Sequence, residues 1–165
     1  MSELNKIALK ILSNGKGILA ADESYGTMTK RLEVVNVEST PKNRLTFRET
    51  LFSSQSMKDC IGGVIFYDET INQISSSGKS IPELISASGA VPGIKVDTGA
   101  KNLANSPEEK ITEGLDGLRE RLKKYYKLGA RFTKWRGVYS ISDNYPSKLA
   151  IHSNCLLYTS DAADE

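Results

Sequence analysis

The sequence has few of the residues that build metal sites. Its 165 residues include two cysteines, Cys60 and Cys155, and one histidine, His152. Structural zinc is held by four Cys or His ligands at short, regular spacings, and these three residues have no such spacing. We therefore expect no zinc site, and we assign no metal ligand and no cofactor to this chain.

Long hydrophobic runs and a strong net charge are also missing. No run approaches the roughly 18 apolar residues of a membrane span, and no leading segment resembles a signal peptide. The 22 basic and 20 acidic residues give a net charge of +2, which does not demand nucleic acid as a partner. We expect a cytoplasmic protein with neither a membrane nor a nucleic acid as partner.

The sequence does contain an alternation of apolar strand-like runs with helical segments. The runs are continuous and not alternating, as in parallel strands that are buried on both faces. Strands are expected to begin near residues 17, 60, 91 and 132, in Gly17–Ala21, Cys60–Glu69, Val91–Asp97 and the segment after residue 131. Helices are expected over residues 4–12, 27–35, 40–52, 81–87 and 106–128. Such βα alternation predicts a parallel sheet with right-handed crossovers.

The last of these helices is predicted from a local start signal. In Ser106-Pro107-Glu108-Glu109 the serine can cap a helix, the proline suits its first turn, and the two acids favour the positive end of the helix dipole. Leucines then recur on one side, and Gly129 supplies a stop. We expect the main body of this helix between Ile111 and Leu128.

Polar residues follow each predicted strand, and their placement decides between two architectures. Four βα units form either an open doubly wound sheet or half of an eight-unit barrel. Barrel enzymes place their chemistry at the carboxyl ends of the strands, which is where the polar side chains fall: Asp22, Asp68, Glu69, Lys95, Asp97, Lys134 and Arg136. No glycine fingerprint for a dinucleotide follows the first strand. We predict an α/β fold that forms the N-terminal half of a barrel.

The stretch RFTKWRGV, residues 131–138, places two cations in a strand that is predicted to be buried. Side chains alternate along a strand, so Lys134 and Arg136 share one face with Phe132, whereas Trp135 points away. If that face lines a cavity, the cavity is cationic. The same spacing pairs Lys95 with Asp97 and Asp22 with Ser24.

Five motifs in this order resemble those of class I fructose-1,6-bisphosphate aldolases: GKGILAADESYGTMTKRL, CIGGVIFYDET, GIKVDTG, GLDGLRERL and FTKWRGV. The resemblance implies a (β/α)8 TIM barrel. It also implies the reversible cleavage of fructose 1,6-bisphosphate to dihydroxyacetone phosphate and glyceraldehyde 3-phosphate in glycolysis, through a lysine Schiff base and without a metal. It suggests a homotetramer that acts on sugar phosphates.

The resemblance also assigns roles to single residues. Lys134 matches the family lysine beside the scissile bond, and Asp22 matches the aspartate that contacts the carbon-four hydroxyl, so both are candidate catalytic residues. A carboxylate flanked by Lys95 and Lys134 is expected to stay ionised. The candidate substrate-binding residues are Ser24, Thr27, Arg31, Arg44, Lys95 and Arg136, of which Lys95, Ser24 and Thr27 match contacts to the carbon-six phosphate.

Each assignment has a structural alternative. Ser24 and Thr27 are equally suited to capping a helix, Arg31 and Arg44 to being solvated helix charges, and Arg136 to a structural ion pair. Lys134 could be a surface lysine at a strand end, and Asp22 could cap the next helix, which is compatible with catalysis.

The likeness covers roughly residues 14–154 and leaves part of the family pattern unassigned. A barrel needs about 250 residues, and the Schiff-base lysine belongs to a later strand. We expect residues 1–154 to be a partial aldolase barrel, inactive alone, with open sheet edges that favour aggregation or pairing. Residues 155–165 resemble translated sequencing adaptor and are predicted to be a non-native tail. Two alternatives stay open: another Schiff-base sugar-phosphate aldolase, and a non-catalytic sugar-phosphate-binding scaffold.

Overall fold

In a computed structural model, which describes residues 2–162 and the side chains of residues 2–155, the chain divides into two units. The first unit comprises Met1–Lys95 and Arg121–Lys134, and the second comprises Val96–Glu120 and Trp135–Glu165. Each unit is described by itself below. Among the described residues, no helix combines the length and the apolar character needed to cross a bilayer.

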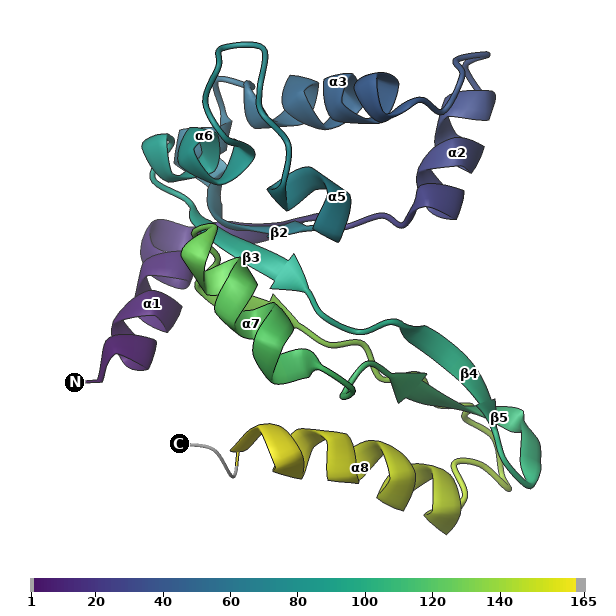
Figure 1. Cartoon of the computed structure of the whole chain (residues 1–165). Helices are drawn as coiled ribbons and strands as arrows, with labels where there is room; N and C mark the ends of the chain where they lie inside the picture. The colour runs from purple at the N-terminus through teal and green to yellow at the C-terminus, as the bar shows by residue number, and fades with distance from the viewer. Residues whose placement is uncertain (1, 163–165) are drawn as a thin grey trace. The chain divides into compact units, whose positions relative to one another are not determined.

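The first unit is built around four parallel strands, in the order β1-β2-β3-β6. The two central strands, β2 and β3, are labelled in Figure 1. Their bounds are β1 Gly17–Ala21, β2 Ile61–Phe66, β3 Val91–Lys95 and β6 Phe132–Lys134. The register pairs Ala21 with Phe66, Phe66 with Ile94, and Lys95 with Lys134. The carboxyl ends of all four strands therefore meet at one edge of the sheet. With the helices that alternate between these strands, the unit forms half of a TIM barrel, as the sequence predicts.

Helices connect and cover these strands at positions that local sequence explains. They are α1 Glu3–Leu12, α2 Tyr25–Glu33, α3 Pro41–Phe52, α4 Met57–Cys60, α5 Asp68–Ile71, α6 Ile81–Ala87 and α7 Leu118–Lys127, with a 3-10 turn, η1, over Ser13–Gly15. Thr40 caps α3 by accepting a hydrogen bond from the Asn43 amide, and a proline follows it. Ser80 and Glu83 form a reciprocal capping box on α6.

The core of the first unit lies between the sheet and these helices. Val64, Phe66 and Ile94 are fully buried, and Phe52 meets Phe66 edge to face with ring centroids 5.7 Å apart. Close approach explains the glycines of β2. A Cβ on Gly62 would lie 1.8 Å from the Ile11 carbonyl oxygen, so the end of α1 contacts the strand backbone directly.

Two of the predicted strands differ from expectation in their exposure. Most of β1 is exposed, because it forms one edge of the sheet and no described strand pairs with its outer side. The other edge, β6, is half-buried and ends at Lys134. The prediction that Lys134 and Arg136 share a face of one buried strand is therefore wrong, since Arg136 lies beyond the strand and in the second unit.

The second unit contains an antiparallel hairpin, β4 Gly99–Leu103 and β5 Ser106–Glu113, and the helix α8 Lys148–Ala162 (Figure 1). The prediction of a helix from Ser106 is thus wrong up to residue 117. Asn105 adopts a left-handed conformation with φ 64°, which allows a tight turn, and the strands then satisfy each other's backbone groups. Pairing between strands outweighs the local helix-start signal in Ser106-Pro107.

Side chains fix α8 to β5 within this unit. Glu109 is buried and accepts hydrogen bonds from the Ser147 amide at 2.8 Å and from the Ser106 hydroxyl at 2.8 Å. Asn154 donates to the Lys110 carbonyl at 3.0 Å. The helix continues from the predicted native region into the segment predicted as a tail, whose residues 163–165 lie outside the described part. The boundary at residue 154 stays a prediction.

Candidate functional site

An ion pair joins the carboxyl ends of the two outer strands of the first unit. Lys134 is the last residue of β6, and Asp22 directly follows β1. The Lys134 Nζ donates a hydrogen bond to Asp22 Oδ2 at 2.6 Å. Asp22 is 8% exposed, whereas the Lys134 side chain is 31% exposed. In a flat sheet, three steps of about 4.8 Å would separate these strands by about 14 Å. The contact is in keeping with a sheet that curls as a barrel wall does.

A second lysine lies beside this pair. Lys95, the last residue of β3, is the direct register partner of Lys134 on β6. Paired residues of neighbouring parallel strands project to the same side of the sheet, so the two ammonium groups belong to one face. The structure thus brings together three of the predicted residues: the cations Lys95 and Lys134 and the carboxylate Asp22. Such an arrangement attracts an anion and can stabilise a negative charge that develops on oxygen.

Two hydroxyls lie at the start of α2, immediately after Asp22. Ser24 is the N-cap residue by position, yet its side chain makes no hydrogen bond to the helix amides. Its Oγ lies 3.3 Å from Thr27 Oγ1, and both residues are exposed. The capping alternative therefore does not hold for the Ser24 side chain. Two exposed hydroxyls beside the first amides of a helix suit an anion such as phosphate.

Arg31 and Arg44 lie in different environments. The Arg31 side chain is 51% exposed and forms an ion pair with Glu23 in the loop after β1. Arg44 is 7% exposed, and its guanidinium donates to Glu69 through Nε at 2.9 Å and through a terminal nitrogen at 2.6 Å. The hydrogen bond to Glu69 raises the pKa of Arg44. A contact between Arg44 and substrate would require this bidentate pair to open, and its predicted role stays a prediction.

Arg136 is placed in the second unit, with an exposed side chain. Its carbonyl accepts a hydrogen bond from the Thr112 hydroxyl at 2.6 Å, which attaches the segment after β6 to β5. Its assignment to substrate binding depends on the family resemblance and stays a prediction. Among the described residues, no group of three or more histidine, cysteine or acidic side chains converges as a metal site would require.

Sequence reasoning missed one residue near this site, Arg48 of α3. Its side chain is 1% exposed and donates a hydrogen bond to the carbonyl of Glu23 at 2.6 Å. The available signal was its spacing of four residues from Arg44, which puts both arginines on one face of the helix. Its partner is 25 residues away in sequence, so the spacing alone did not identify the contact.

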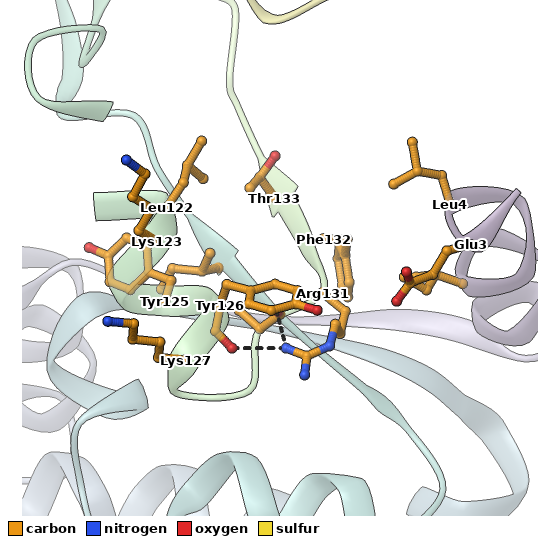
Figure 2. Close-up of a pocket in the computed structure, with 13 residues that line it drawn as sticks. Glu3, Leu4, Leu122, Lys123, Tyr125, Tyr126, Lys127, Arg131, Phe132 and Thr133 are labelled. Carbon is orange, nitrogen blue, oxygen red and sulfur yellow. Dashed lines mark hydrogen bonds between the residues drawn. The ribbon is translucent and has the colours of Figure 1, made fainter. Parts of the chain in front are cut away.

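A cavity of about 670 Å³ lies elsewhere in the first unit. Figure 2 shows Leu4 of α1 on one side, Leu122 and Tyr126 of α7 on the other, and Phe132 of β6 between them. The Arg131 guanidinium lies 4.1 Å from the centre of the Tyr126 ring at its rim. None of the predicted site residues lines this cavity, so it is distinct from the cluster around Asp22 and Lys134.

Comparisons with known proteins agree with the fold and with the motifs. The family model for class-I fructose-bisphosphate aldolase matches residues 3–161. A probable fructose-bisphosphate aldolase class 1 of Xylella fastidiosa is 47% identical over 154 residues, which cover 93% of this chain and 46% of the relative. The cytosolic fructose-bisphosphate aldolase 6 of Arabidopsis thaliana is 51% identical over 152 residues, or 92% of this chain and 42% of the relative.

A solved structure gives the same result in three dimensions. The fructose-bisphosphate aldolase of Plasmodium falciparum, crystallised with TRAP and a small-molecule inhibitor, superposes with a TM-score of 0.87 at 44% identity. The match covers 92% of this chain and 44% of the Plasmodium chain. The chain therefore spans less than half the length of the relatives it matches.

Proposed function

Because the chain belongs to the class-I fructose-bisphosphate aldolase family, we propose that it supplies the first half of an enzyme that cleaves fructose 1,6-bisphosphate reversibly. The products are dihydroxyacetone phosphate and glyceraldehyde 3-phosphate. The observation that carries the proposal is the hydrogen bond of 2.6 Å between Lys134 and Asp22, with Lys95 in register beside Lys134. The family resemblance assigns Lys134 and Asp22 to the reacting carbons and Lys95 to the carbon-six phosphate.

The chemistry divides between this chain and the sequence that follows it in the relatives. A lysine amine of the later part condenses with the carbon-two ketone and releases water, giving an iminium. The bond between carbons three and four then breaks, its electron pair moves toward the iminium, and the carbon-four hydroxyl passes its proton to a base of the later part as it becomes the aldehyde. The enamine that remains takes up a proton, and water hydrolyses the imine, which releases dihydroxyacetone phosphate and regenerates the amine. We assign the Schiff-base lysine to no residue of this chain.

The residues of this chain act on the carbon-four oxygen and on the phosphates. Asp22 contacts the carbon-four hydroxyl, and the Lys134 ammonium stabilises the negative charge that develops on its oxygen. Lys95, Ser24 and Thr27 bind the carbon-six phosphate through one ammonium and two hydroxyls. Arg31, with its exposed guanidinium, meets the phosphate nearer the mouth of the barrel.

The open edges of the sheet support the proposal that further βα units complete the barrel. The outer sides of β1 and β6 pair with no described strand, and the apolar cavity beside β6 has room for the side chains of a neighbouring unit. We propose that the complete protein is a cytosolic homotetramer, and that residues 1–165 alone do not cleave the substrate.

The test compares two proteins with one substrate. One is the chain of residues 1–165, and the other is the full-length protein, obtained by extending the reading frame beyond residue 154. We expect only the longer protein to cleave fructose 1,6-bisphosphate, and borohydride to trap a covalent adduct of substrate on it. Cleavage of a different ketose phosphate with the same trapping would indicate another Schiff-base aldolase. Binding without trapping or cleavage would favour a scaffold and contradict the proposal.

A further inference from the structure

Arg48 is a buried cation that the proposed chemistry does not use. Its side chain is 1% exposed, and burial lowers the pKa of its guanidinium. A charge in such a site is costly unless hydrogen bonds and opposite charges compensate it. One terminal nitrogen donates a hydrogen bond of 2.6 Å to the carbonyl of Glu23, and the carboxylates of Glu23 and Glu69 supply opposite charge.

A second contact ties Arg48 to the helix α5. Its other terminal nitrogen lies 3.6 Å from Oε2 of Glu69, the second residue of α5. That carboxylate is fixed by two hydrogen bonds from Arg44. Arg44 in turn donates to the Ser39 carbonyl at 2.5 Å. Arg48 therefore links the loop after β1 to the Arg44–Glu69 ion pair, whose side chains are 9% and 11% exposed.

The carbonyl that Arg48 holds lies one residue after Asp22. The peptide group of Glu23 is planar and rigid, so fixing its oxygen restricts the direction in which the chain leaves β1. This restriction limits where the Asp22 carboxylate can lie, because only the φ and ψ rotations of Glu23 separate the held peptide group from the one that follows Asp22. Asp22 meets Lys134 at 2.6 Å, a distance that small movements of the loop would lengthen. Reacting groups must be held to within about 0.5 Å by the residues that support them.

We propose that Arg48 is a positioning residue, which holds the Glu23 carbonyl so that Asp22 stays hydrogen-bonded to Lys134. The geometric part of this inference stands on the first unit alone. Its consequence for catalysis rests on the proposed function. The two parts are tested separately, so that either can fail without the other.

The geometric test follows the acylation of Lys134 in the full-length protein by mass spectrometry. An ammonium that is hydrogen-bonded to a carboxylate must leave it and lose a proton before it reacts. Asp22→Asn calibrates the rate of an unpaired Lys134, and the exposed Lys10 of α1 serves as the internal reference. We expect Arg48→Met to raise the Lys134 rate, relative to Lys10, by at least half of the increase that Asp22→Asn produces.

Two further variants separate positioning from general destabilisation. Arg48→Lys keeps the buried cation. A lysine lacks the planar guanidinium, whose two terminal nitrogens contact the Glu23 carbonyl and the Glu69 carboxylate at the same time. We therefore expect Arg48→Lys to raise the rate of Lys134 acylation while the protein stays folded. Lys42→Met removes an exposed charge from the same helix and should leave the rate unchanged. A folded Arg48→Lys protein with the wild-type Lys134 rate overturns the inference.

The catalytic test measures kcat and KM for fructose 1,6-bisphosphate in the same proteins. Misplacing a reacting group by about 1 Å costs roughly 100-fold, so we expect Arg48→Met to lower kcat by 10- to 100-fold with KM changed less than about threefold. Unchanged kcat in a variant with accelerated Lys134 labelling would refute the catalytic consequence. An inactive wild-type protein would refute the proposed function, and the labelling result would still decide the geometric part.

Discussion

Gly62 of β2 gives the sharpest prediction about stability. A Cβ at this position would lie 1.8 Å from the carbonyl oxygen of Ile11 and 2.7 Å from its carbonyl carbon. A Cβ in a real structure almost never lies within 3.0 Å of a non-bonded heavy atom, so α1 would have to shift away from β2 by over 1 Å. The obstacle is backbone, and no side-chain rotation relieves it. Overpacking of a core costs about 1–3 kcal/mol, and we expect Gly62→Ala to fall at the upper end, near 3 kcal/mol.

The assay is urea unfolding of the full-length protein, followed by far-ultraviolet circular dichroism. Gly26→Ala provides the matched control, because a Cβ on Gly26 would meet nothing within 4 Å and α2 gains a better helix former. We expect the control to be neutral or to add up to about 1 kcal/mol. A Gly62→Ala midpoint equal to that of wild type would refute the close approach of α1 to β2.

Two partly buried hydrogen-bonded pairs give further predictions. Tyr125 donates to Asp68 at 2.8 Å, and burial with this bond raises the pKa of Tyr125 to about 12. Near pH 10 the unfolded state loses the Tyr125 proton, whereas the folded state keeps it. The contribution of Tyr125 to stability is therefore full below pH 10 and is lost as the pH rises toward 12. In urea titrations, the difference in unfolding free energy between wild type and Tyr125→Phe should be near 2 kcal/mol below pH 10 and should shrink between pH 10 and 12. Glu69→Gln leaves the buried Arg44 without its counter-charge and should cost about 3 kcal/mol in thermal and urea unfolding, and a cost below about 1 kcal/mol would show that the pair is solvated.

The parallel half of the fold could be predicted because its signals are local. Continuous apolar runs such as Val91–Lys95 are separated by helices such as α3 and α6, which begin at good capping residues, so these elements can be recognised from short windows. The short helices α4 and α5 cannot, and they replace the two ends of the strand predicted over Cys60–Glu69. The hairpin over residues 99–113 could not, because Ser106-Pro107 looks like a helix start and the strand depends on a partner. The exposure of β1 could not be predicted for a related reason, since it depends on which strands pair with its outer side.

In the candidate site, too, some contacts could be predicted from the sequence and others could not. Asp22 and Lys134 are 112 residues apart, yet the rule that parallel strands align their carboxyl ends was enough to bring them together. The environment of Arg44 could not be predicted, because helical spacing alone does not distinguish a solvated arginine from one paired with Glu69. Arg136 does not share the predicted face with Lys134, because β6 ends at Lys134 and side chains alternate only within a strand.

Asp22 and Lys134 are proposed to act together on one reacting oxygen. The direct measurement is a double-mutant cycle on kcat for fructose 1,6-bisphosphate in the full-length protein, with Asp22→Asn, Lys134→Met and the combined variant. We expect each single change to lower kcat by about 100- to 1000-fold, and the combined change to cost little more than either alone. Single changes with small effects, or losses that multiply in the double variant, would contradict the account.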